Sequence, residues 1–182
     1  MRSTSFRQRT ETDWPRRQPV FNRVYQFYRA AFVPVSPQEY DVLGTHLTEE
    51  QSQLFRCMAR CDQRHCLDVF YALRNANYRD GTVLRAALLH DVGKSAARLR
   101  IWHRVAAVLL DLFNPDWARR LAANGWAWAR PFAVHVDHAE LGARSAAEAG
   151  CSPEIVSLIR RHHKLESGDS TLAALQWADR YN

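Results

Sequence analysis

Residues 86–94 read Ala-Ala-Leu-Leu-His-Asp-Val-Gly-Lys, an apolar run that ends in an adjacent histidine and aspartate. The preceding Asp80-Gly81-Thr82 is typical of a turn that opens a helix, so we expect a helix from about residue 82 to His90. The positions three and seven residues before His90 and Asp91 are all apolar, and these spacings share a helix face. Both polar side chains therefore continue the faces that a helix turns toward the core.

The same feature, a titratable side chain on an apolar stripe, recurs on three further predicted helices. These residues are His65 in the segment 48–74, His162 and His163 in 153–163, and Asp179 in 171–182. A single inward histidine is usually a hydrogen-bonded core residue, but burial of such a group costs several kcal/mol unless it is paired or binds a metal. Because four predicted helices each direct a titratable side chain toward the core, we favour a shared metal centre. Imidazoles with carboxylates suit Mn²⁺, Fe²⁺, Co²⁺, Ni²⁺ or Zn²⁺, which would lower the pKa of bound water and give a hydroxide nucleophile near neutral pH.

Helical signals dominate the chain, and neither an internal repeat nor a sustained alternating strand pattern occurs. Thr48-Glu49-Glu50-Gln51 is typical of a capping box, and Pro115 and Pro153 each follow a residue that favours the N-cap. We predict helices over 48–74, 82–90, 101–113, 114–124, 138–149, 153–163 and 171–182, with a loop over 166–170. A chain of 182 residues is the size of one domain. The expected fold class is all-α, with a loose basic N-terminal extension over 1–45 and one helical domain over 46–182.

The net charge of +6 is concentrated at the N-terminus. Residues 1–35 hold seven arginines against Glu11 and Asp13, so the remaining chain is close to neutral at +1. We therefore expect no nucleic-acid partner for the domain itself. The basic arm could contact RNA, anionic lipid or a partner protein, but a solvated terminus explains it best.

Composition and apolar runs exclude several classes of protein. With 47% hydrophobic and 24% charged residues the chain is typical of a globular protein. The longest apolar run, Val105–Leu110, is too short to span a bilayer, and no signal-peptide core follows the N-terminus. The four cysteines contain no CxxC pair, and we interpret them as small buried hydrophobes rather than thiolate ligands. We expect a cytoplasmic protein without a membrane span.

The polar positions carry a resemblance to a known family. His65, the pair His90-Asp91 and Asp179 resemble the H…HD…D signature of the HD-domain metal-dependent phosphohydrolases, over about residues 48–182. The middle motif is the specific one, because a Gly-Lys pair follows His90-Asp91. The segments 138–143 (His-Ala-Glu-Leu-Gly-Ala) and 161–163 (Arg-His-His) resemble the extra histidines of a two-metal subgroup. That subgroup includes the HD-GYP cyclic-di-GMP phosphodiesterases and HD hydrolases that split diadenosine tetraphosphate.

The resemblance implies a helical HD-domain bundle with one or two divalent metals, which could be Fe, Mn, Zn, Ni or Co. The implied metal ligands are His65, His90, Asp91 and Asp179 for the first ion and His138, His162 and His163 for the second, with Asp91 bridging. The resemblance also makes Asp91 and Lys94 the catalytic residues, where Lys94 would meet a phosphate oxygen or support the His-Asp pair. No Gly-Tyr-Pro follows His162-His163, so cyclic-di-GMP is not the expected substrate.

Further residues are candidates for substrate binding. Arg98 lies just after the Gly-Lys turn, where it could bind phosphate, although a solvated face explains it equally well. His103 could face the same pocket as a phosphate contact, and His135 could line it or form a hydrogen bond in a loop. The tryptophans at 102, 117, 126 and 128 are expected to pack between helices, and exposure of some of them would indicate a homodimer.

The function expected from the sequence is a metal-dependent phosphohydrolase acting on a phosphomonoester or phosphodiester of nucleotide type. Two alternatives stay open. Some HD proteins with the extra histidines are di-iron oxygenases, which an iron-specific, oxygen-consuming activity would reveal. A catalytically silent HD domain could serve as a regulatory binding module, but the complete set of ligand residues argues against it.

Overall fold

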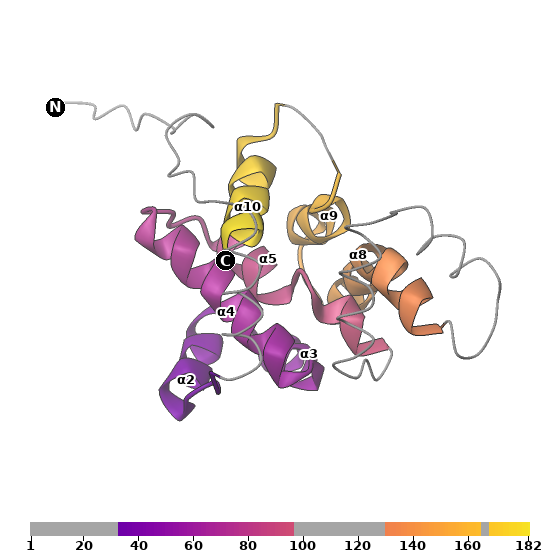
Figure 1. Cartoon of the computed structure of the whole chain (residues 1–182). Coiled ribbons are helices and arrows are strands. Elements are labelled where there is room, and N and C mark those ends of the chain that lie inside the picture. The colour runs from indigo at the N-terminus through magenta and orange to yellow at the C-terminus, as the bar shows by residue number, and fades with distance from the viewer. Residues whose placement is uncertain (1–32, 97–129, 165–167) are drawn as a thin grey trace, which may run out of the picture.

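A computed structural model of the chain describes residues 33–96, 130–164 and 168–182. All regular elements within these ranges are helical, so the predicted all-α class is confirmed (Figure 1). In chain order they are α2 (Pro37–His46), α3 (Glu49–Cys57), α4 (Arg60–Asn75), α5 (Gly81–Leu89), the 3₁₀ helix η2 (Val92–Ala96), α8 (Arg130–Glu148), α9 (Pro153–Arg161) and α10 (Ser170–Tyr181). The predicted helices over 101–113 and 114–124 lie outside the described ranges.

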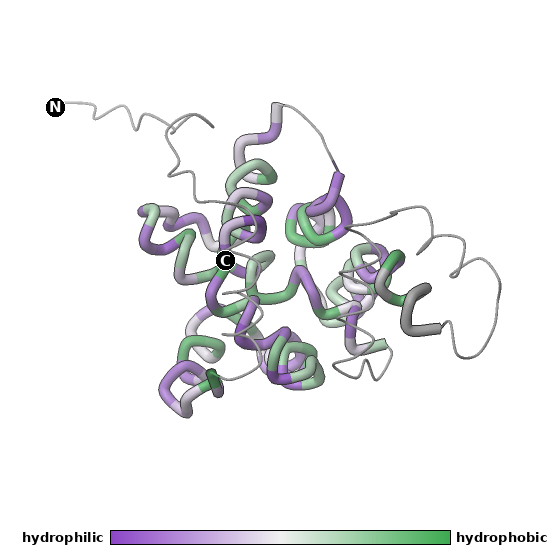
Figure 2. The backbone as a smooth tube through the Cα atoms, in the orientation of Figure 1, coloured by the Kyte–Doolittle hydropathy of each residue, from purple (hydrophilic) through white to green (hydrophobic). Residues whose placement is uncertain are grey.

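The apolar helix α5 lies at the centre of the arrangement, where its tube is mostly green in Figure 2. Leu84, Leu88 and Leu89 are buried on it, and α4, α9 and α10 all pack against it. Burial of a leucine side chain stabilises a fold by about 1.5–3 kcal/mol. The core therefore fixes the end of α5, where His90 and Asp91 follow.

Local signals begin several helices as predicted. The side chain of Thr48 accepts a hydrogen bond from the backbone of Gln51, whose own side chain returns one to the backbone of Thr48, and this confirms the capping box. Asp80 caps α5 by accepting from the amide of Thr82 at 2.8 Å. Pro153 is the first residue of α9. These helix starts depend on contacts within three residues, which is why the sequence predicts them.

The single helix predicted over 48–74 is wrong in its middle. Met58 and Ala59 are extended, with ψ of 154° and 148°, and they separate α3 from α4. The buried carboxamide of Gln63 donates to the carbonyls of Arg56 and Met58, at 3.1 and 2.9 Å. A side chain from the next helix thus satisfies the carbonyls that the break exposes, and neither Gly nor Pro marks the break in the sequence.

The helix predicted to start near His138 is α8, which begins eight residues earlier, at Arg130. Residue 131 is a proline in the first turn of α8, a position where a helix tolerates proline. His138 consequently lies inside α8, two turns from its start, rather than at an end. The backbone of His138 is therefore held by helical hydrogen bonding on both sides.

Helix α2 covers Pro37–His46, and all but the last of these residues lie in the stretch 1–45 that we expected to be a loose extension. Ser36 and Glu39 form a capping box with Pro37 at the first helical position, a local signal that the sequence analysis did not use. Leu43 of α2 is fully buried in the core cluster. The predicted boundary near residue 45 stays a prediction, but packing against the domain already begins in α2.

A buried ion-pair network attaches α2 to α4. The guanidinium of Arg64 lies 2.6 Å from Glu39 of α2 and 2.8 Å from Asp68 of α4, and its side chain is only 3% exposed. Such a pair stabilises only when its hydrogen bonds are satisfied, and Arg64 meets two carboxylates. The next residue along α4 is His65, so this network holds the helix turn that carries it.

Candidate metal centre

The structure brings all seven predicted ligand side chains together, and five segments supply them. They are His65 of α4, His90 and Asp91 directly after α5, His138 of α8, His162 and His163 directly after α9, and Asp179 of α10. The ends of α5 and α9 contribute two residues each. Because α5 packs against α4, α9 and α10, the core that forms the fold also assembles this cluster.

One half of the cluster pairs two imidazoles with two carboxylates. Nε2 of His65 lies 2.9 Å from Oδ1 of Asp179 and 3.9 Å from Oδ2 of Asp91. Nε2 of His90 lies 3.5 Å from Oδ1 of Asp179 and 3.8 Å from Oδ2 of Asp91. Two nitrogens and two oxygens thus converge on one position.

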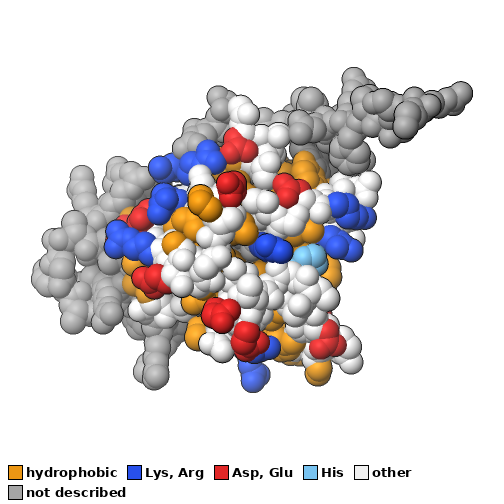
Figure 3. All heavy atoms as spheres, turned by 180° about the vertical axis from the view of Figure 1, so that it is seen from behind, with side chains coloured by type: hydrophobic (Ala, Val, Ile, Leu, Met, Phe, Trp, Pro, Cys, Tyr) orange, Lys and Arg blue, Asp and Glu red, His pale blue; other side chains and the backbone are white. Residues whose placement is uncertain are grey.

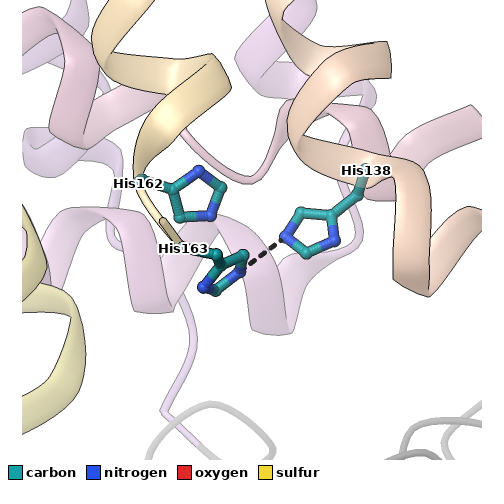
Figure 4. A group of neighbouring side chains, drawn as sticks. All are labelled: His138, His162 and His163. Carbon is teal, nitrogen blue, oxygen red and sulfur yellow. Dashed lines mark hydrogen bonds between the residues drawn. The ribbon is translucent and has the colours of Figure 1, made fainter. Parts of the chain in front are cut away.

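The other half consists of His138, His162 and His163 (Figure 4). Nε2 of His163 lies 3.0 Å from Nε2 of His138, and one nitrogen from each of the three rings lies within 4.8 Å of the others. Oδ1 of Asp91 approaches Nε2 of His138 to 3.4 Å, whereas its Oδ2 faces His65 and His90. The carboxylate of Asp91 therefore lies between the two halves and presents one oxygen to each.

His90 and His162 have the ring orientation that a metal ligand needs. Nδ1 of His90 lies 2.9 Å from the carbonyl oxygen of Ala87, and Nδ1 of His162 lies 2.6 Å from that of Ile159. A carbonyl only accepts, so each Nδ1 carries a proton and donates, and Nε2 is the nitrogen left to bind a metal. Both Nε2 atoms are buried and without a hydrogen-bond partner, which is costly unless a cation binds there. The donor set therefore fits a divalent transition metal.

Burial and charge keep most of the other ligand groups in the state that binds a cation. Burial and neighbouring positive groups lower the pKa of His138 well below its usual value and that of His162 to about 3, so both rings are neutral. Burial alone would raise the pKa of Asp91, but Lys94 and the surrounding imidazoles hold it well below its usual range. His138 and His162 are thus neutral, and Asp91 is ionised, at neutral pH.

The pKa of His90 is shifted in the opposite direction to those of His138 and His162. Burial acts to lower its pKa, but Cys66, Asp91 and Asp179 together raise the pKa well above the usual value. In the absence of a metal, a proton on His90 therefore neutralises part of the negative charge of the two carboxylates. Metal binding has to displace this proton, and a cation and a proton compete for the same position.

Lys94 of η2 contacts the cluster through Asp91. Its ammonium donates to Oδ2 of Asp91 at 2.6 Å, and its side chain is 20% exposed. Burial alone would lower the pKa of Lys94, but Asp91 raises it above the usual value, so the side chain stays charged. A protonated lysine has no lone pair and cannot be a ligand. Of the two roles expected for Lys94, this contact corresponds to support of the His-Asp pair.

Two glycines let η2 approach α8 closely. A Cβ on Gly93 would overlap the carbonyl oxygen of His138 and lie 2.6 Å from the backbone nitrogen of Gly142. A Cβ on Gly142 would lie 3.1 Å from the backbone nitrogen of Gly93. The pair brings Asp91 and His138 together from different elements. The sequence analysis gave Gly142 no role, although its place four residues after His138 on one helix face was a usable signal.

Gly93→Ala is therefore expected to lower the free energy of unfolding by about 2–3 kcal/mol, because backbone atoms must move to admit the methyl group. Chemical denaturation of the metal-free protein measures this. Gly44→Ala in α2 is the matched control, since nothing lies within 4 Å of its Cβ position and alanine favours a helix interior. Equal stability of wild type and Gly93→Ala would contradict the close approach.

Several candidates from the sequence cannot be placed at the centre. Arg98 and His103, expected to bind substrate, lie outside the described residues, as do the four tryptophans at 102, 117, 126 and 128. His135 lies in α8 among residues whose side chains are not described. The interpretation of the cysteines as buried is wrong for Cys57, which is exposed, whereas the thiol of Cys66 is buried 3.7 Å from Nδ1 of His90.

The surface shows mixed charge on one face. Figure 3 shows basic and acidic side chains interspersed with hydrophobic ones on the side turned away from the view of Figure 1. This distribution agrees with the near-neutral charge of the chain beyond its N-terminal arm. Within the described ranges no helix has the length and apolar character needed to cross a membrane.

Comparison with known proteins gives one match. The family model described as HD domain matches residues 63–182, about two thirds of the chain, and includes all seven residues of the cluster. Neither the curated proteins nor the solved structures contain a match to the chain.

Proposed function

The chain belongs to the HD-domain family, whose members are commonly metal-dependent hydrolases, and we propose that it is a two-metal phosphohydrolase. The substrate we propose is a phosphate ester of nucleotide type. The single observation that carries this proposal is the orientation of His90 and His162. Each ring donates a hydrogen bond from Nδ1 to a backbone carbonyl and directs a buried Nε2, which makes no hydrogen bond, into the cluster.

Bound divalent metal would supply positive charge to polarise a phosphoryl group and to lower the pKa of water. The chain's own residues would hold and orient the reactants. Asp91 lies between the two halves, with one oxygen facing each, and would be a ligand that both ions share. Lys94 holds the Asp91 carboxylate in place and adds a positive charge beside it, where a phosphate would carry negative charge.

Metal analysis of the purified protein, followed by activity assays, tests the proposal. We expect about two equivalents of divalent transition metal per chain, and metal-dependent release of phosphate or nucleotide from a panel of nucleotide mono- and diesters. Oxygen consumption measured with iron-loaded protein distinguishes an oxygenase. Metal-free protein that neither binds added Mn²⁺ or Co²⁺ nor hydrolyses any of the esters would refute the proposal.

His162→Ala is expected to lower the metal stoichiometry by about one ion per chain. His162 belongs to the three-histidine half and also lies within 4.8 Å of ligand atoms of His90 and Asp179. The other half would keep His65, His90, Asp91 and Asp179 as its ligands. Elemental analysis after dialysis against a limiting chelator measures the change. Equal stoichiometry in wild type and variant would mean that these histidines line the pocket without binding a second ion.

A further inference from the structure

The segment that carries His162 and His163 is a turn rather than a helix. Helix α9 ends at Arg161, and residues 162–164 form a turn closed by a hydrogen bond from the amide of Lys164 to the carbonyl of Arg161, at 2.8 Å. Two of the three rings in the second half of the cluster therefore lie on backbone that lacks regular helical hydrogen bonding. Their position requires a contact from outside the turn.

Helix α10 supplies that contact through Gln176. The carboxamide nitrogen of Gln176 donates to the carbonyl oxygen of Lys164 at 2.6 Å and lies 3.4 Å from that of Arg161. These two carbonyls flank His162 and His163 in the sequence. One side chain therefore holds both ends of the turn.

Gln176 also lies on the face of α10 that carries a ligand of the first half. It precedes Asp179 by three residues, which places both side chains on the same side of the helix, one turn apart. Leu172 and Leu175 of α10 are fully buried, so the helix is fixed to the core. Gln176 therefore fixes the turn 162–164 relative to α10, the helix that carries Asp179.

A second contact supports the same junction. Nη2 of Arg161 lies 2.8 Å from Oδ2 of Asp169, and Asp169 caps α10 by accepting from the amides of Thr171 and Leu172. The carboxylate thus joins the last residue of α9 to the first turn of α10. This pair is partly exposed to solvent, as is the bond from Gln176 to Lys164, and exposed ion pairs contribute little to stability.

We propose that Gln176 is a positioning residue for the second metal, acting by holding the turn 162–164 so that His162 and His163 face His138 and Asp91. This inference rests on the proposed two-metal centre. Gln176 touches no ligand side chain in these contacts and donates only to backbone carbonyls. Such outer contacts commonly change metal affinity about 10- to 100-fold.

The test is a titration of metal-free protein with Co²⁺, followed by calorimetry and by the visible absorption of the bound ion. In Gln176→Met, which keeps the size of the side chain and removes the donor, we expect the second dissociation constant to rise about tenfold, with the first unchanged. The absorption of the second ion should broaden. Gln176→Lys keeps a donor at similar reach and should restore most of the affinity.

Gln53→Met on the exposed surface of α3 is the matched control, because it makes the same substitution far from the turn and should leave both constants unchanged. Thermal unfolding of the metal-free proteins separates positioning from folding. If wild type binds two ions and Gln176→Met binds both with wild-type affinity, the inference is overturned while the two-metal centre stands. If wild type binds fewer than two ions, the two-metal proposal fails and the inference fails with it.

Discussion

Asp91→Ala is expected to remove most of the metal from the purified protein and to lower turnover of phosphate esters at least on the order of a thousandfold. The reason is the position of the carboxylate, since Oδ1 lies 3.4 Å from His138 and Oδ2 lies 3.8 Å from His90. Its loss also leaves the ammonium of Lys94 without the carboxylate it contacts. A mostly buried positive charge beside the centre would then repel any cation that approaches the remaining ligands.

Elemental analysis before and after dialysis measures the metal, and circular dichroism checks that the variant is folded. Asp137→Ala is the matched control, because Asp137 is an exposed aspartate on α8, next to His138 in the sequence. It should keep metal and activity. Full metal occupancy in Asp91→Ala would refute the assignment of Asp91 as the ligand shared by both halves.

Lys94→Met is expected to keep the metal content and to lower turnover on the order of a hundredfold, the loss typical of one electrostatic stabiliser. Methionine keeps much of the aliphatic stem and removes the charge. Removal of a cation beside Asp91 cannot weaken the attraction of the centre for metal by charge alone. We therefore expect the ammonium to matter for the reaction rather than for metal occupancy.

Steady-state kinetics on a nucleotide ester, with metal content measured on the same sample, separates these effects. Arg85→Met removes a cation from the exposed side of α5 and should leave turnover unchanged. A regulatory binding module predicts no metal-dependent turnover in wild type or in Lys94→Met. Wild-type rates in Lys94→Met would show that the contact with Asp91 has no catalytic consequence.

Several residues of the cluster could be predicted to face the core because their signal is local. His90 and Asp91 continue the apolar faces of a helix, and this periodicity survives in α5. His65 was found on a stripe drawn across a helix that the structure divides at Met58 and Ala59, but the part of the stripe around it lies within α4. A periodic pattern therefore identifies inward residues even where the helix boundaries are wrong.

The contacts that make these residues a centre could not be predicted, because they join parts of the chain that are far apart in sequence. The close approach of Gly93 to α8 depends on how η2 and α8 pack, and the secondary-structure propensities of the residues do not predict it. The same holds for Gln63, whose side chain donates to a carbonyl at the break before α4. It also holds for Gln176, which in the sequence is an ordinary polar residue of a predicted helix. Glutamine has no strong local preference, so its role emerges only from tertiary structure.

His90 and His162 share an arrangement that makes each of them a self-contained unit. Each residue directly follows a helix and bonds through Nδ1 to the carbonyl three residues earlier, so a few consecutive residues determine the tautomer and the ring direction. The direction of each ring relative to its own helix end is therefore set locally, whereas the placement of the turn that carries His162 also involves Gln176. Substitutions elsewhere around the centre are expected to leave this local ring direction unchanged. A designer could transplant the same short segment onto another helix end.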